Sequence, residues 1–297
     1  RADLRRAREL LDSLSARVTR DRPGSYPAIE SCLGSVLWMQ GHFAAARRHL
    51  DDALAFSADA DPDVLNNAWW VSVDPVSVAH IFRALTAALH GDLPTAEREL
   101  AASTGRCDGL GFPRQAQNLV HTYYMEVWVR LEFGQLTEAT AVAAELRSLS
   151  KSAGLDFWRF VSTTVKATLH GLSCLRAGAD RGTLADAAGA LAQLVSGARQ
   201  LNLNSYLPVH DAVVGRLLLA ADLPEQAQQH MDAVLAHTRD NEMNFYDAEL
   251  LRIRARSIAD PAVRGIAAEE ALVLARQQDA PLFELRCLLD INELSGT

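Results

Sequence analysis

Gly41-His42-Phe43, followed three residues later by Ala46, is the first of three copies of a turn signature in this chain. The others are Gly91-Asp92-Leu93 with Ala96, and Gly134-Gln135-Leu136 with Ala139. Glycine favours the left-handed backbone conformation in which many helices end. Each copy joins two segments whose apolar residues follow a helical period. A unit repeated in this way is typical of stacked helix pairs, so the signature predicts an all-α helical-repeat protein.

The first copy also shows the alternation of small and large residues that close helix packing requires. Gly34 and Ala46 are small enough for two antiparallel helices to approach closely, and Leu37, Phe43 and Leu50 fill the space between them. This pattern is of the tetratricopeptide type. We therefore expect a tetratricopeptide-like right-handed α-superhelix of about six helix pairs.

Further turns are expected at Gly178, at Asp222 and near Pro261, so successive turns lie 50, 43, 44, 44 and about 39 residues apart. The standard repeat has about 34 residues, so the helices or their connections must be longer here. The widest interval contains residues 59–63, Asp-Ala-Asp-Pro-Asp, which we expect to form a loop. The predicted helices span residues 2–20, 26–40, 43–57, 75–90, 93–103, 113–133, 136–153, 157–176, 183–200, 205–220, 224–238, 244–259, 262–278 and 281–294.

We interpret residues 1–297 as a single helical-repeat solenoid. The predicted helix within residues 1–22 has no partner before it, and the predicted helix within residues 281–297 has none after it. Together with Arg1 in place of the usual methionine, these unpaired helices suggest a piece excised from a longer polypeptide.

The composition excludes several classes of protein. Of the 297 residues, 49% are hydrophobic and 22% are charged, which is typical of a folded globular chain and not of a disordered one. No stretch has the roughly 18 uninterrupted apolar residues of a membrane span, and no signal peptide is visible, so we expect a cytoplasmic protein. A net charge of -8 argues against direct binding of nucleic acid.

The C-terminal part resembles a known family. Residues 246–253, Tyr-Asp-Ala-Glu-Leu-Leu-Arg-Ile, resemble that family's A-E-L-x-R-L helix, residues 271–280 resemble its A-L-x-x-A-R-x-Q-x-A helix, and residues 284–286 match E-L-R. The family is the C-terminal helical-repeat region of bacterial multidomain signalling ATPases, found with adenylate/guanylate cyclase domains or with LuxR-type DNA-binding domains. Looser matches extend the resemblance over residues 25–297. Ala255 departs from the glycine usual in the family, but alanine still permits close packing.

The repeats and the resemblance together favour a non-enzymatic sensor or protein-interaction region of a signalling or transcription regulator. It would relay the binding of a partner or an inducer to an upstream ATPase, cyclase, kinase or DNA-binding domain. Its partner would be another protein or its own upstream domains. A homo-oligomer is a further alternative. The alternative is a receptor for a small-molecule inducer that the superhelix encloses, as the comparable superhelix of the maltose-responsive activators binds a sugar.

The sequence has no motif for catalysis, a cofactor or a metal. It lacks the G-x-x-x-x-G-K-[ST] run that binds nucleotide phosphates and the G-x-S-x-G elbow of hydrolases. His42 and His49, like His230 and His237, are seven residues apart, with no further ligand at a suitable spacing. We therefore expect no catalytic residue, no cofactor and no metal. Glu249 and Arg252, one turn apart, are expected to form a surface ion pair.

The candidate contact residues come from the expected geometry of stacked pairs, in which the first helix of each pair lines the concave face. Aromatic residues interleaved with arginines on such a face are typical of recognition surfaces. For Ile81 and Trp128, packing in the core between repeats is the alternative interpretation. Trp69 and Trp70 are candidate loop contacts, with burial as a loop anchor as the alternative. The predicted groove contacts are Trp38, Ile81, His121, Tyr124, Trp128, Thr168, Leu172, Arg216 and Arg252.

Overall fold

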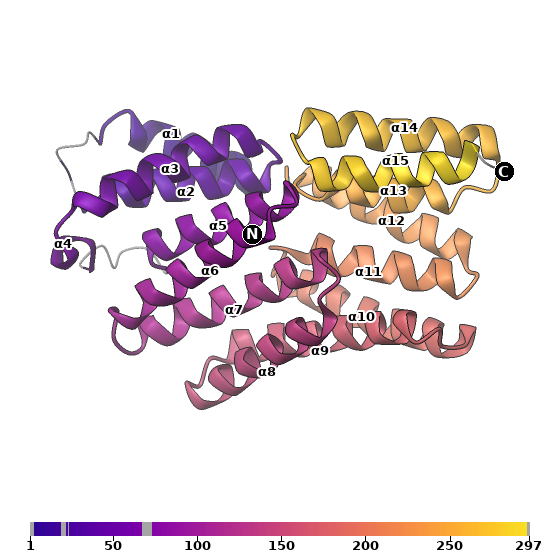
Figure 1. Ribbon diagram of the computed structural model, residues 1–297, viewed down its shortest axis with the longest axis horizontal. Coiled ribbons are helices and arrows are strands. Elements are labelled where there is room, and N and C mark those ends of the chain that lie inside the picture. The colour runs from indigo at the N-terminus through magenta and orange to yellow at the C-terminus, as the bar shows by residue number, and fades with distance from the viewer. Residues whose placement is uncertain (1–2, 19–21, 23, 67–72, 296–297) are drawn as a thin grey trace. The chain divides into compact units, whose positions relative to one another are not determined.

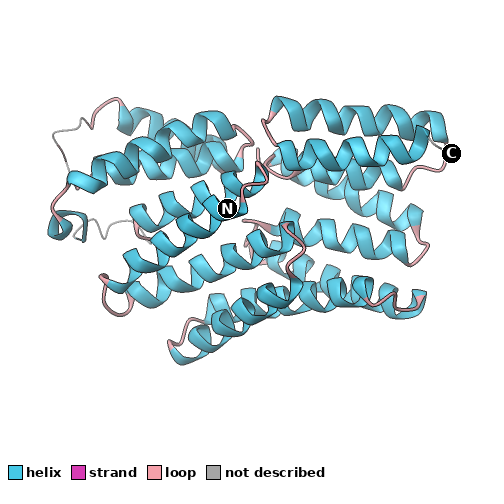
Figure 2. Ribbon diagram, in the orientation of Figure 1, coloured by secondary structure: helices cyan, strands magenta, loops and turns pink. Residues whose placement is uncertain are grey.

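The computed structural model describes residues 3–18, 22, 24–66 and 73–295, and within these ranges all regular structure is helical (Figures 1 and 2). An observed helix occupies every predicted helical range. The helices are α1 (Leu4–Ser15), α2 (Tyr26–Met39), α3 (Phe43–Asp59), α4 (Pro62–Asn66), α5 (Pro75–Leu89), α6 (Leu93–Asp108), α7 (Arg114–Glu132), α8 (Leu136–Ser152), α9 (Asp156–Arg176), α10 (Arg181–Gln200), α11 (Leu207–Ala220), α12 (Pro224–Asp240), α13 (Asp247–Arg256), α14 (Pro261–Gln277) and α15 (Pro281–Ser295).

Helices α1 and α13 are shorter at both ends than their predicted ranges, 2–20 and 244–259, and two further differences have a visible structural cause. The short helix α4 begins inside the segment expected to be a loop, because the Asp61 carboxylate accepts a hydrogen bond from the N–H of Asp63 and Pro62 suits a first helical position. Helix α6 continues past residue 103, where its predicted range ends. Tertiary contacts stabilise the C-terminal part of α6. Ser103 Oγ lies 2.8 Å from Ser77 Oγ on α5 and 2.9 Å from Thr122 Oγ1 on α7.

The predicted turns have the backbone conformation that ends a helix. Gly41, Gly91, Gly134 and Gly178 have φ between 62° and 80°, and Asp222 has φ of 63°. At the first of these turns the N–H of His42 donates to the carbonyl of Leu37, and the other four close in the same way. The sequence prediction of these five turns is therefore confirmed. The connection before Pro261 differs, because Asp260 caps α14 with an extended backbone.

The chain forms two compact units, one comprising Leu4–Ser162 and the other containing Thr163–Thr297. In the first unit α2 packs on α3, α5 on α6, and α7 on α8, while α5 also contacts both α2 and α7. In the second unit α10, α11 and α12 pack in succession, α13 packs on α14, and α14 on α15. Helix α13 contacts α11 and α15 as well. Sequential neighbours thus pack as pairs, consistent with a helical repeat.

Small residues lie where paired helices approach each other, as predicted. A Cβ atom on Gly34 would lie 2.7 Å from Leu50 Cγ and 3.2 Å from the carbonyl oxygen of Ala46, so α2 and α3 meet at a distance that only glycine allows. In the second unit a Cβ on Gly215 would lie 2.9 Å from the Cγ2 methyl of Ile253, which cannot swing away, and 2.9 Å from Met231 Cε. Overpacking such a contact costs about 1–3 kcal/mol, which explains the glycine at these positions.

A histidine and a carboxylate meet at one register in three helix pairs. We count from the turn residue of each pair, which is Gly41, Gly91 or Asp222. The residue eleven positions before it contacts the residue eight positions after it, so the two partners are 19 residues apart. Among the described residues, no three histidine, cysteine or acidic side chains gather as metal ligands would. The contacts are His49 Nδ1 to Glu30 Oε2 at 2.7 Å, His80 Nδ1 to Glu99 Oε2 at 2.7 Å, and His230 Nε2 to Asp211 Oδ1 at 2.9 Å.

Candidate functional site

Three of the predicted groove residues lie on first helices of the pairs and are buried. Trp38 on α2 and Ile81 on α5 have no exposed surface, and Trp128 on α7 is 4% exposed. The structure brings Trp38 and Trp128 together, with ring centroids 5.6 Å apart in an edge-to-face arrangement. The ring of Phe82 on α5 packs against Trp38 at 5.4 Å. These side chains form an aromatic core shared by α2, α5 and α7.

The structure also brings His121 and Tyr124 together, around a tryptophan that the candidate residues did not include. The ring of Trp158 on α9 lies 5.7 Å from His121 and 6.0 Å from Tyr124. Phe157, which is about half exposed, packs against Trp158 at 5.2 Å. Burial in these surroundings lowers the pKa of the His121 imidazole to about 4, because the charged form loses its hydration.

This shift predicts a pH-dependent stability. In the unfolded chain the imidazole takes up a proton near pH 6.5, whereas in the folded chain it stays neutral down to about pH 4. The free energy of unfolding therefore falls as the pH falls between these values, with a contribution from His121 of up to about 1.4 kcal/mol per pH unit. We expect His121→Gln to have a flatter profile of urea midpoint against pH over this range than the wild-type chain. Parallel profiles would contradict the assignment.

The four groove residues of the second unit differ in their surroundings. Thr168 is buried, and its hydroxyl lies 2.8 Å from His210 Nδ1. Leu172 is half-buried, and Arg216 is exposed. Arg252 is held in an ion cluster, described next. Trp69 and Trp70 lie outside the described residues.

The predicted ion pair of Glu249 and Arg252 is present, but it is buried and not on the surface. Arg252 Nε lies 2.8 Å from Glu249 Oε2, and its Nη1 lies 2.6 Å from Asp290 Oδ2 on α15. Arg286 on α15 approaches Glu249 at 3.8 Å. Burial raises the pKa of Glu249, but the charge and hydrogen bonds of Arg252 outweigh it, so the pKa is lowered and the carboxylate stays ionised. The cluster joins α13 to α15.

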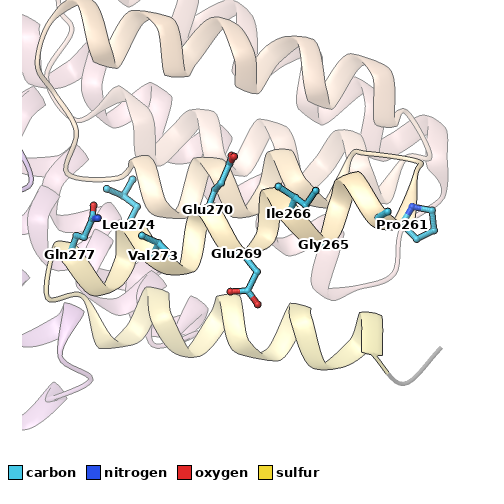
Figure 3. Close-up of a pocket in the computed structure, with 9 residues that line it drawn as sticks. Pro261, Gly265, Ile266, Glu269, Glu270, Val273, Leu274 and Gln277 are labelled. Carbon is cyan, nitrogen blue, oxygen red and sulfur yellow. The ribbon is translucent and has the colours of Figure 1, made fainter.

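An open hollow of about 620 Å³ lies along the outer face of α14 (Figure 3). Exposed residues of α14 line it at spacings of four and three, namely Ile266, Glu270, Val273 and Gln277, and exposed Val263 continues the row three residues before Ile266. We call these five residues the α14 seam. The three apolar members are 51%, 64% and 49% exposed. The spacing is that of one helix packing against another.

The opposite face of α14 is occupied by its own neighbours. Ala271 and Leu272 are buried and pack against Leu251 on α13 and Leu288 on α15. Helix α14 is therefore apolar on two faces, of which the fold covers one. The seven-residue spacing of Ile266 and Val273 is visible in the sequence, but only the structure shows that these two residues fall outside the buried set.

Two carboxylates stand beside the hollow. Glu269 and Glu270 are both exposed, and neither makes an ion pair within the described part of the chain. Figure 3 shows Glu270 on the same side of α14 as Ile266, whereas Glu269 extends to the opposite side. Both carboxylates line the hollow, and Glu270 is the one that continues the spacing of the seam.

Comparison with known proteins identifies no family. No family model matches the chain, and no curated protein matches it. The class of protein is therefore given by the fold alone. The chain is all-α, and its helices pack as sequential pairs. Within the residues that the structure describes, no helix is long and apolar enough to cross a membrane.

Proposed function

We propose that this chain is a non-enzymatic protein-interaction region, and that a helix of a protein partner docks on the α14 seam. The observation that carries the proposal is the pair of exposed apolar side chains of Ile266 and Val273, which line the hollow, with exposed Val263 next to them on the same helix. Burying apolar surface is the main favourable contribution to association. An amphipathic helix that lies in an apolar groove presents anchors at the spacing found in this seam.

The shape of the hollow favours a protein partner over a small molecule. Sites for small molecules are concave and enclose most of the ligand. The hollow on α14 is open, and the seam runs along one helix of 17 residues, or about 25 Å. That length matches a helix of four to five turns. The alternative, an inducer receptor with an enclosed pocket lined by residues such as Tyr124 and Trp128, has no comparable support from the described geometry.

The finer interpretation of the fold is part of the same proposal. We propose a tetratricopeptide-like right-handed superhelix of the kind found in bacterial multidomain signalling ATPases, which relays binding at α14 to an upstream domain. The close approach at Gly34 and the left-handed turn residues support it. A partner that binds one arrangement of the helices more tightly would shift the population toward that arrangement.

A synthetic helical peptide tests the docking site. The probe is an 18-residue Ala/Gln-rich peptide with leucine at the positions that face the seam, glutamine at its central position and a fluorescent label. We expect saturable binding by fluorescence anisotropy with a Kd on the order of 10 μM. The double substitution of Ile266 and Val273 by Asp should weaken it at least ~10-fold, because the partner would then desolvate two carboxylates.

Leu201→Asp is the matched control. Leu201 is 64% exposed, as is Ile266, but it lies at the end of α10 and outside the seam. We expect this variant to bind the peptide as the unmodified chain does. No saturable binding, or an equal loss in both proteins, would refute the site. Sedimentation that shows a homodimer lost in the Ile266 and Val273 variant would also refute it, since the occupant would then be a second copy.

A further inference from the structure

Glu270 occupies the middle of the α14 seam. It lies four residues after Ile266 and three before Val273, so it is about 6 Å along the helix axis from the first and about 4.5 Å from the second. Its side chain is on the Ile266 side of α14 (Figure 3). A helix that covers both apolar anchors therefore also covers the Glu270 carboxylate and removes it from water.

Covering this carboxylate is costly unless a cation accompanies it. A buried charge without a partner costs several kcal/mol, whereas a charge with a hydrogen-bonded counter-ion costs far less. The two arginines of α14 lie six residues to either side of Glu270, about 9 Å along the axis. Arg276 is engaged with Glu284, with Nε 2.7 Å from Oε1, and Arg264 donates to the carbonyl of Ala259 at 3.2 Å. Neither supplies the charge.

We infer that the helix that docks on α14 carries an arginine or lysine in the middle of its apolar face, opposite Glu270. This inference rests on the proposed docking site and names the chemistry of its partner. The expected pattern is an apolar anchor three or four residues before the basic residue and another three or four residues after it, to meet Ile266 and Val273. Arginine fits best, because its planar guanidinium donates two parallel hydrogen bonds to a carboxylate.

Three peptides test the inference. They share the probe described above and differ only at the central position, which is arginine, leucine or glutamate. With the unmodified protein we expect the arginine peptide to bind about ten times more tightly than the leucine peptide, and the glutamate peptide to bind least tightly. With Glu270→Leu the order of the arginine and leucine peptides should reverse, because the seam is then apolar throughout.

Glu269→Leu is the matched control, since it removes the same charge from the other side of the hollow. We expect this variant to keep the order of the unmodified protein. The inference is wrong, while the docking site stands, if the peptides bind but their order of affinity stays the same with Glu270→Leu. It is also wrong if the order of affinity reverses with Glu269→Leu. If none of the peptides binds, the docking site itself is refuted.

Discussion

Substitution of Asp74 by alanine is expected to lower the free energy of unfolding by about 3–5 kcal/mol. Asp74 has no exposed surface and caps α5, where its Oδ1 accepts the N–H of Ser77 at 2.9 Å. The same carboxylate accepts two hydrogen bonds from Arg106, from Nε at 3.1 Å and from Nη2 at 2.9 Å. Arg114 Nη2 approaches it at 3.6 Å. Removal of the carboxylate leaves two largely buried guanidinium groups without their counter-ion.

Asp92→Ala is the control for the capping contribution. Asp92 caps α6 in the same way, accepting the N–H of Thr95 at 3.0 Å, but its carboxylate is in water and pairs with no buried arginine. We expect a much smaller loss of stability, measured for both variants by urea denaturation followed by circular dichroism. Equal losses would show that Asp74 acts as a helix cap alone.

Substitution of Trp38 by alanine is expected to cost about 3–5 kcal/mol. The indole is fully buried and packs against the rings of Phe43, Phe82 and Trp128 at 5.1 to 5.6 Å. Its N–H donates to Thr86 Oγ1 at 3.1 Å. The substitution opens a cavity among α2, α5 and α7, which no neighbouring side chain can fill without leaving its own contacts.

Trp38→Phe separates packing from hydrogen bonding. Phenylalanine retains most of the aromatic contact and loses the indole N–H, so we expect a loss of about 1–2 kcal/mol. The Thr86 hydroxyl keeps its bond to the carbonyl of Phe82, which limits the cost. Urea denaturation followed by circular dichroism measures both variants. An alanine variant as stable as the phenylalanine one would show that the aromatic cluster adds little to stability.

The helices and turns could be predicted because their signals are local. Gly41 and the equivalent turn residues need a left-handed backbone, and this requirement is visible in the sequence. The burial of Trp38 depends on contacts with Phe82 and Trp128, 44 and 90 residues away, which no local pattern specifies. Its role as a groove contact, like that of the other predicted groove residues, stays a prediction.

The α14 seam escaped sequence reasoning for a physical reason. Apolar residues on both faces of a helix satisfy the core pattern equally well, so Ile266 and Val273 are indistinguishable in the sequence from Ala271 and Leu272. Only the positions of α13 and α15 decide which face is covered. Likewise, Glu249 and Arg252 have the spacing of a surface pair, and it is Asp290 on a distant helix that makes the pair part of a buried cluster.

The helix pairs with a histidine–carboxylate contact share the contact between two positions and not the residue at either position. In α2 and α3 the first helix supplies the acid, Glu30, whereas in α5 and α6 it supplies the imidazole, His80. A position-by-position comparison of these two helix pairs therefore finds different residues at both positions, although the contact is the same. Common ancestry of such helix pairs is best judged by comparing the two positions together. The same holds for the design of hybrids between helix pairs.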